Sequence, residues 1–141
     1  MEKKEINVRM AVPGDLDYVN QHHCLPRAVM QRKILHEEIF LLIFDGEPVG
    51  QLRLAFLWST IPYIELIYIE SNFRKRGFSL ILLGYLEEHL RRGGYDVLYS
   101  SSQVDEPEPQ GWHRHMGFEA CGLINGLNQG GIGEVFFRKA L

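Results

Sequence analysis

The sequence has little of what marks a membrane, secreted or nucleic-acid-binding protein. Its two cysteines, Cys24 and Cys121, have no metal-binding spacing and are too few for a disulfide framework. No apolar run approaches the roughly 18 residues of a membrane span, and the N-terminal MEKKEINVRM has no apolar signal-peptide core. The formal net charge is −3, and the basic residues cluster locally. We therefore expect a cytoplasmic protein that binds neither membranes nor nucleic acid, with each cysteine a small buried residue.

The motifs of several enzyme classes are also absent. There is no GxxxxGK[ST] or GxGxxG, and no Ser/His/Asp or Cys/His arrangement. His113 and His115 are two apart on a predicted helix and point to nearly opposite sides, and the adjacent His22 and His23 likewise diverge. The sequence therefore predicts no metal site. A phosphate-ligand protein or small hydrolase unrelated to coenzyme A is disfavoured.

Hydrophobic periodicity predicts one mixed α/β domain over residues 1–141. The apolar content of 45% and the charged content of 23% suit a globular chain with a sizeable core. The expected strands cover 6–10, 39–44, 49–57, 63–69, 96–102, 118–125 and 133–140, and the expected helices 15–22, 26–36, 78–92 and 110–116. This βααβββαβαββ order predicts a central sheet of about seven strands, flanked by about four helices.

A strand, a basic turn and a helix between Tyr63 and Gly94 organise the chain. The run from 63 to 69 has strand composition, and the apolar positions from Phe78 to Leu90 fall along one helical stripe. The turn between them, RKRGFS at 74–79, places three cations and a glycine before the helix. Since the first amides of a helix lack intrahelical acceptors and its dipole is positive there, we expect a phosphate or pyrophosphate. The alternative is an ordinary surface turn that is basic.

Two motifs resemble those of the GNAT superfamily of acetyl-CoA-dependent N-acyltransferases. The phosphate loop of that family, Q/R-x-x-G-x-G/A, is similar to Arg74-x-x-Gly77-x-Ser79, where serine replaces glycine or alanine. Its C-terminal signature, F/L-Y-x-x-x-G-F, is similar to residues 112–118, where His113 stands at the tyrosine position. The resemblance covers roughly residues 3–141. It implies the GNAT fold, and acetyl-CoA as the acyl-donor cosubstrate.

The resemblance also implies where acetyl-CoA binds. The turn would hold the pyrophosphate through backbone N–H groups, with one of its cations free to reach the ribose phosphate. In the family, the preceding strand splays from its neighbour at a bulge, and its exposed backbone pairs with the pantetheine arm. Ile69 is the candidate N–H donor to the developing oxyanion. The expected donor-binding residues are Ile67, Tyr68, Ile69, Arg74, Lys75, Arg76, Gly77, Phe78 and Ser79.

Direct transfer needs a base for the amine and allows an acid for the departing CoA thiolate. Glu65 is the candidate base, because burial in its apolar strand would raise its pKa toward neutrality. It could instead face solvent or pair with an arginine, and water or Tyr63 would then be the base. His113 is the candidate acid, since an imidazole is partly protonated at neutral pH; packing against pantetheine or capping a carbonyl is the alternative. Glu70 is expected to be a solvated connector residue.

Two further groups of residues are candidates for contact with the substrates. Tyr18, His22, Arg27 and Met30 have near-helical spacing and could line an acceptor pocket, although ordinary helix packing also explains them. The serines at 100–102 end a strand and could bind pantetheine or the acceptor.

The leading functional prediction is an acetyl-CoA-dependent N-acetyltransferase that acts by direct attack of a primary amine on the thioester. The amine could belong to a small molecule or a peptide, and a homodimer is left open. The alternative is a non-catalytic acyl-CoA-binding module, which the departures from the family motifs at Ser79 and His113 keep open.

Overall fold

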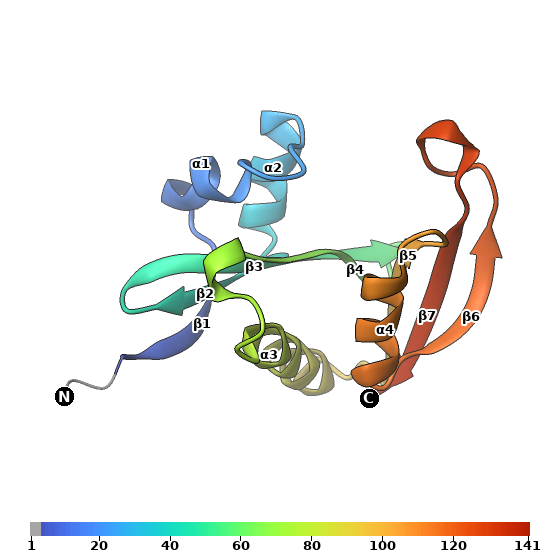
Figure 1. Ribbon diagram of the computed structural model, residues 1–141. Helices are drawn as coiled ribbons and strands as arrows, with labels where there is room; N and C mark the ends of the chain where they lie inside the picture. Colours follow the sequence, from blue (N-terminus) through green and yellow to red (C-terminus); the bar gives the residue numbers. More distant parts are fainter. Residues whose placement is uncertain (1–3) are drawn as a thin grey trace. The chain divides into compact units, whose positions relative to one another are not determined.

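A computed structural model describes residues 4–141, and their backbone follows the predicted order of elements (Figure 1). The described strands are β1 (Ile6–Met10), β2 (Ile39–Phe44), β3 (Glu47–Leu57), β4 (Ile61–Ile69), β5 (Val97–Gln103), β6 (Glu119–Ile124) and β7 (Glu134–Ala140). The described helices are α1 (Leu16–Val19), α2 (Arg27–Leu35), α3 (Phe78–Arg92) and α4 (Pro107–His115), with 3-10 turns η1 (Pro13–Asp15), η2 (Ser71–Phe73) and η3 (Gln129–Gly131). The strands form one sheet in the order β1-β2-β3-β4-β5-β7-β6. The predicted α/β fold, with about seven strands and four helices, is confirmed.

Two helix boundaries differ from the prediction by three residues, for local reasons. Helix α1 ends at Val19, because the side-chain amide of Asn20 bonds both the N–H of Leu25, at 2.8 Å, and its carbonyl, at 3.0 Å. These two bonds close the chain into a loop in place of a further helical turn. Helix α4 begins at Pro107, three residues before its predicted start, because a proline is well suited to the first position of a helix.

The contacts of the chain divide it into two compact units. The first unit comprises Met1–Leu54 and Leu66–Leu86, and the second comprises Ala55–Glu65 and Glu87–Leu141. The single domain expected over 1–141 stays a prediction, and its residues 1–3 lie outside the described part of the chain.

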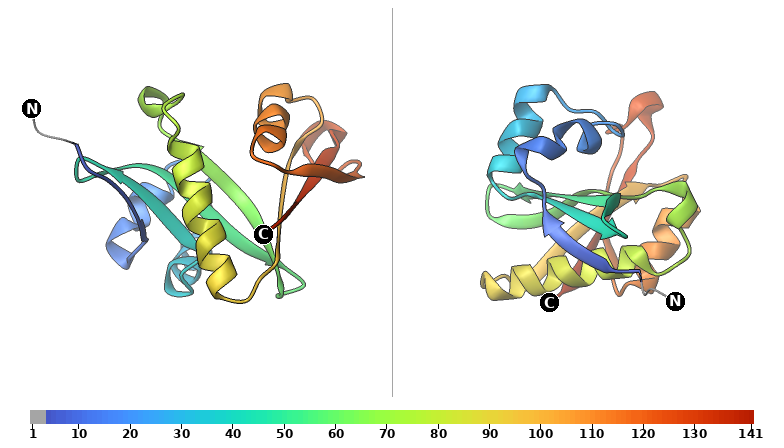
Figure 2. Two further views of the ribbon diagram at one scale, coloured as in Figure 1. Left: turned by 90° about the horizontal axis from the view of Figure 1, so that it is seen from below. Right: turned by 90° about the vertical axis from the view of Figure 1, so that its left-hand side faces the viewer.

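In the first unit, the antiparallel strands β1, β2 and β3 have helices on both faces. Helices α1 and α2 lie on one side of these strands and α3 begins on the other (Figures 1 and 2). Because strand side chains alternate, the apolar run of β2 serves both faces. Leu41 packs with Met30 and Ile34 of α2, whereas the ring of Phe40 lies 5.8 Å from that of Tyr85 of α3. This arrangement explains why all of β2 is apolar.

In the second unit, β7 pairs antiparallel with both β5 and β6, and α4 packs against this sheet. The contact is made by His113 of α4, whose ring stacks on Phe137 of β7 with centroids 4.4 Å apart and an interplanar angle of 4°. An ion pair at 2.6 Å joins Lys139 of β7 to Glu87 near the end of α3. The stacking of His113 holds α4, the helix that carries most of the second family-like motif, against β7.

Both cysteines are exposed, so the expectation that each is buried is wrong. Cys24 lies in the loop after α1, where its thiol donates to the Asn20 carbonyl at 2.8 Å. Cys121 lies on β6, an edge strand whose residues are all exposed. Within residues 4–141, no helix combines the length and the apolar character needed to cross a membrane.

Candidate functional site

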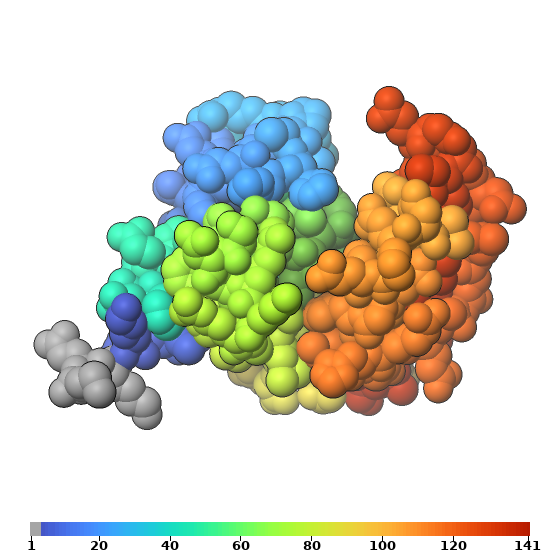
Figure 3. Space-filling model, in the orientation of Figure 1, coloured from blue at the N-terminus to red at the C-terminus, as the bar shows by residue number. Residues whose placement is uncertain are grey.

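The turn between η2 and α3 presents backbone amides on the surface of the first unit. Lys75 and Gly77 adopt left-handed conformations, with φ of 62° and 79°. The Ile81 N–H donates to the Gly77 carbonyl at 3.3 Å, which makes Gly77 the residue from which the helical hydrogen bonds begin. A Cβ placed on Gly77 would meet no atom within 4 Å, and the yellow-green atoms of this segment face the viewer in Figure 3. The backbone at Gly77 is therefore open to the approach of an anion at the start of the helix.

Two of the three cations in the turn are held by neighbouring groups. The Arg74 Nε donates to the Ile69 carbonyl at 2.9 Å, and its guanidinium lies 5.4 Å from the centre of the Tyr68 ring. The Arg76 guanidinium lies 5.3 Å from the centre of the Phe73 ring. Lys75 is exposed at the tip of the turn. Arg74 thus ties the turn to the end of β4, and the exposed Lys75 is the cation better placed to reach a ribose phosphate.

The end of β4 directs the backbone of Ile69 away from β3. The Glu70 N–H donates to the Val49 carbonyl of β3 at 2.8 Å, and the Tyr68 carbonyl would lie 2.9 Å from a Cβ on Gly50 of β3. Because successive residues of a strand direct their N–H and C=O groups to opposite edges, those of Ile69 point to the other edge. At the edge of β4 that faces away from β3, the Ile69 carbonyl accepts a hydrogen bond from Arg74 Nε. The Ile69 N–H points to this same edge. This direction suits the predicted role as a donor to pantetheine or to an oxyanion.

Glu70 is not the solvated connector that we expected. It is half-buried, accepts a hydrogen bond from the Tyr18 hydroxyl at 3.1 Å, and lies 3.9 Å from His22 Nε2. The His22 ring stacks on Tyr68, with centroids 4.2 Å apart. Burial raises the pKa of Tyr18, and the nearby charge of Glu70 raises it further. Tyr18 and His22 therefore come together on the end of β4.

The other two acceptor candidates do not join this cluster. Met30 is 0% exposed and belongs to the core beside α2, whereas Arg27 is exposed at the start of that helix. Helix packing accounts for Met30.

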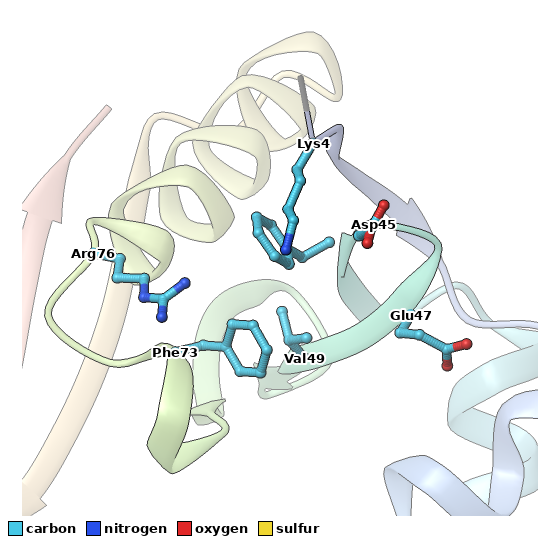
Figure 4. Close-up of a pocket in the computed structure, with 7 residues that line it drawn as sticks. Lys4, Asp45, Glu47, Val49, Phe73 and Arg76 are labelled. Carbon is cyan, nitrogen blue, oxygen red and sulfur yellow. The ribbon is translucent and has the colours of Figure 1, made fainter. Parts of the chain in front are cut away.

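A pocket of about 360 Å³ adjoins the turn on the first unit. In Figure 4, Lys4 and Arg76 extend toward it from different segments, and Phe73 forms part of its wall. Asp45 and Glu47 also line it. Because two carboxylates offset the two cations, the pocket is less suited to a phosphate than the turn itself.

A chain of hydrogen bonds in the second unit links three strands. The hydroxyls of Tyr63 (β4) and Ser101 (β5) lie 2.6 Å apart, and Ser101 donates to Glu134 Oε2 (β7) at 2.6 Å. The Asn128 amide donates to Glu134 Oε1 at 2.9 Å. Burial raises the pKa of Tyr63, its bond to Ser101 lowers it, and the charges of Glu134 and Glu65 raise it. The sequence offered Tyr63 as an alternative base, but it gave no signal for Glu134 or Asn128.

Glu65 is exposed, so the expected burial of this carboxylate is wrong. It follows Ile64, which is 3% exposed, and the alternation of strand side chains therefore turns Glu65 to the other face. Its role as the base stays a prediction that burial does not support.

His113 lies in the core of the second unit. Its Nδ1 lies 2.7 Å from the Pro109 carbonyl and its Nε2 2.7 Å from the Ser100 hydroxyl. Since a carbonyl only accepts, Nδ1 carries the proton and Nε2 accepts from Ser100. Burial lowers the pKa of His113, against smaller raising effects of the Pro109 carbonyl and the charge of Glu134. The acid role stays a prediction, and the geometry fits the alternative of packing and carbonyl capping.

The three serines at the end of β5 have different surroundings. Ser100 bonds His113 within the core, and Ser101 belongs to the chain of bonds that includes Tyr63. The Ser102 hydroxyl is buried without a hydrogen-bond partner among residues 4–141. Contact of these serines with pantetheine or the acceptor stays a prediction.

The comparison with protein families agrees with this strand, turn and helix. Residues 12–118 match the Acetyltransferase (GNAT) family, and the chain belongs to this family. The GNAT resemblance, the assignment as an acyltransferase and acetyl-CoA as the acyl donor are thereby confirmed. A sequence search of curated proteins found no match.

Solved structures share the fold at low sequence identity. A GNAT-family acetyltransferase from Bacillus cereus ATCC 10987 superposes with a TM-score of 0.80 at 21% identity, over 96% of this chain and 97% of the other. Ard1 from Thermoplasma volcanium gives 0.84 at 15% identity, over 96% and 97%. The ribosomal-protein-S18-alanine N-acetyltransferase from Escherichia coli gives 0.79 at 11% identity, over 96% and 94%. At these identities the likeness concerns the fold.

Proposed function

We propose that the protein transfers an acetyl group from acetyl-CoA to a primary amine of a small molecule or a peptide, by direct attack of the amine on the thioester. The observation that carries the proposal is the open turn at Gly77, set between β4 and the start of α3. The name of the Escherichia coli enzyme describes acetylation of an alanine in a ribosomal protein. Because that enzyme has the same fold, its name supports the proposal that the acceptor of this protein is an amine.

In this proposal the turn binds the pyrophosphate of acetyl-CoA. The amides at the start of α3 would donate to phosphate oxygens, and Gly77 leaves room for the ligand to approach the backbone. The Ile69 N–H would donate to the thioester carbonyl, where it stabilises the negative charge that develops during attack. The residues present therefore fit an acyl-CoA donor.

The transfer reaction requires few catalytic groups from the protein. The amine loses a proton and attacks the carbonyl carbon, after which the C–S bond breaks and the thiolate takes up a proton. Much of the acceleration can come from holding the two reactants together. Glu65, which is exposed on β4, is the base that the sequence suggests.

A non-catalytic acyl-CoA-binding module is the second candidate. The observation in its favour is His113, which stands at the position of the family tyrosine but has both ring nitrogens bonded within the core. Release of free CoA thiol in the presence of an amine separates the two candidates.

A paired experiment tests the donor site. We expect acetyl-CoA at a hundredfold above its Kd to add about 2.7 kcal/mol to the free energy of unfolding. Gly77→Glu, which adds bulk and negative charge to the turn, should abolish this gain. Gly126→Glu is the matched control, since Gly126 has a φ of 77° and equally open space around its Cβ position.

The control variant should keep the shift in melting temperature on addition of acetyl-CoA. No shift for the unmutated protein at millimolar acetyl-CoA would contradict the donor assignment. A panel of small and peptide amines, followed by thiol detection, then tests the transfer.

A further inference from the structure

The cavity beside the turn lies within the first unit and has an aromatic floor. The rings of Phe44 and Phe73 lie 5.5 Å apart in an edge-to-face arrangement, and the lining residue Val49 is 4% exposed. The volume of the cavity is about 360 Å³. Sites for small molecules typically span about 300 to 1,000 Å³, so this cavity suits a ligand of the size of an amino acid.

Two cations from different segments are held over this floor. The Lys4 Nζ lies 5.6 Å from the centre of the Phe44 ring, and the Arg76 guanidinium lies 5.3 Å from the centre of the Phe73 ring. Figure 4 shows both side chains directed toward the cavity. Neither cation forms an ion pair with another residue of the described part of the chain, 4–141. Two like charges beside one cavity favour an anionic group that can contact both.

A carboxylate lines the same cavity from a well-defined turn. Asp45 and Gly46 join β2 to β3 with φ of 52° and 81°, the left-handed conformations typical of a two-residue hairpin turn. The Asp45 N–H donates to the Glu5 carbonyl at 2.9 Å, which holds the turn to the residue before β1. The carboxylate of Asp45 has no ion-pair partner among residues 4–141. Glu47 also lines the cavity, but its side chain extends away from it in Figure 4.

We propose that this cavity binds a free α-amino acid with an apolar side chain. The α-carboxylate contacts Lys4 and Arg76, and the α-ammonium contacts Asp45. The apolar side chain lies on the two phenylalanine rings. Such a ligand carries one charge of each sign on a small apolar body, as the lining of the cavity requires. A phosphate has no cation for Asp45 and no apolar part for the rings.

The bound amino acid is a ligand and not the acceptor of the transfer. An ammonium paired with a carboxylate has no free electron pair with which to attack a thioester. The lining residues also come from the chain before β1, the β2–β3 hairpin, η2 and the turn. Ile69, whose N–H is assigned to the thioester, is not among them.

Titration calorimetry of the full chain without acetyl-CoA tests the site with three matched probes. L-leucine carries both charges, N-acetyl-L-leucine lacks the ammonium, and L-leucine methyl ester lacks the carboxylate. We expect L-leucine to bind. Each derivative should bind more weakly by about tenfold or more, because it leaves one charged side chain of the cavity without its partner.

Two variants remove one charge each from the cavity. Lys4→Gln and Asp45→Asn should each weaken the binding of L-leucine by about tenfold or more. Asparagine is also tolerated in the left-handed conformation, so Asp45→Asn keeps the hairpin turn. Arg32→Gln and Asp17→Asn are the matched controls, since they remove the same charges from exposed positions of α2 and α1. The controls should keep the affinity for L-leucine.

The melting temperatures of Lys4→Gln and Asp45→Asn should match that of the unmutated protein, so that weaker binding is not a consequence of unfolding. Equal affinity for L-leucine and its two derivatives would overturn the proposal. Unchanged affinity in both Lys4→Gln and Asp45→Asn would also overturn it, as would the absence of binding with L-leucine, L-valine and L-phenylalanine at millimolar concentration. Because acetyl-CoA is absent from these titrations, their outcome is independent of the proposed transfer.

Discussion

Replacing Arg53 by methionine tests how one buried guanidinium holds the loop after α1. Arg53 of β3 is 1% exposed and donates to the carbonyls of Val19, His22 and His23 at 2.7, 2.7 and 2.6 Å. Methionine keeps much of the length of the side chain but none of its donors. The substitution therefore removes hydrogen bonds while it retains most of the packing.

The size of the loss in the free energy of unfolding depends on which acceptors lose their hydrogen-bond donor in Arg53→Met. The Val19 carbonyl keeps a bond from the Gln51 amide at 3.1 Å. The loss therefore falls on the carbonyls of His22 and His23, with a smaller loss at Gln51 Oε1, which accepts a longer bond from Arg53 Nε at 3.2 Å. Bonds to a charged donor contribute about 1.5 to 3 kcal/mol each, and partly buried carbonyls regain some water. We expect a loss of about 3 kcal/mol, out of the roughly 5 to 15 kcal/mol typical of a domain. For a chain of 141 residues this lowers the melting temperature by about 10 °C.

Thermal and urea unfolding followed by circular dichroism measure this loss. Arg138→Met is the matched control, because Arg138 is exposed on β7, and it should change the free energy of unfolding by less than about 0.5 kcal/mol. If Arg53→Met unfolds within 1 kcal/mol of the unmutated protein, the guanidinium does not hold the loop, and the reasoning from these bonds is refuted.

Two further predictions concern Gly50 and His113. Gly50→Ala places a Cβ 2.9 Å from the Tyr68 carbonyl and 2.7 Å from Ile69 Cδ1, so β4 must shift. We expect the free energy of unfolding to fall by about 1 to 3 kcal/mol and acetyl-CoA to bind more weakly in a titration. An unchanged affinity for acetyl-CoA would contradict the role of Ile69. Because burial lowers the pKa of His113 below its ordinary 6.5, the neutral form stabilises the fold above that pH, and this stability is lost as pH falls from 6.5 toward the folded-state pKa. His113→Phe should reduce this pH dependence in urea unfolding, whereas the exposed His115→Phe should retain it.

The parts of the fold that the sequence predicted are those with local signals. The strand, turn and helix around Gly77 lie within one stretch of chain, and their periodicity, glycine and charges are adjacent. Glu134 lies 33 residues from Ser101, and Ser101 lies 38 from Tyr63. No short pattern relates positions so far apart, because strand pairing alone brings them together. Tyr18 of α1 and Glu70, 52 residues apart, meet through tertiary packing of the helix, which no short pattern encodes either.

The error at Glu65 has a different cause. The apolar strand around Glu65 predicts that this residue is buried, but the two faces of a strand have different surroundings. Ile64 is 3% exposed while its neighbour Glu65 is exposed. The period of the strand was therefore predicted correctly, whereas the face that β4 buries depends on its neighbours in the sheet.

The core position of His113 bears on whether the chain can catalyse transfer without the family tyrosine. A neutral imidazole with both nitrogens bonded has no proton to spare for the CoA thiolate. Such an acid is dispensable, because a free thiol has a pKa of about 8.5 and its thiolate is a good leaving group near neutral pH. A base for the amine is needed more than an acid for the thiolate, because the amine must lose a proton to form the amide. Since the departing thiolate does not require an acid from the protein, the departure at His113 is compatible with an active enzyme.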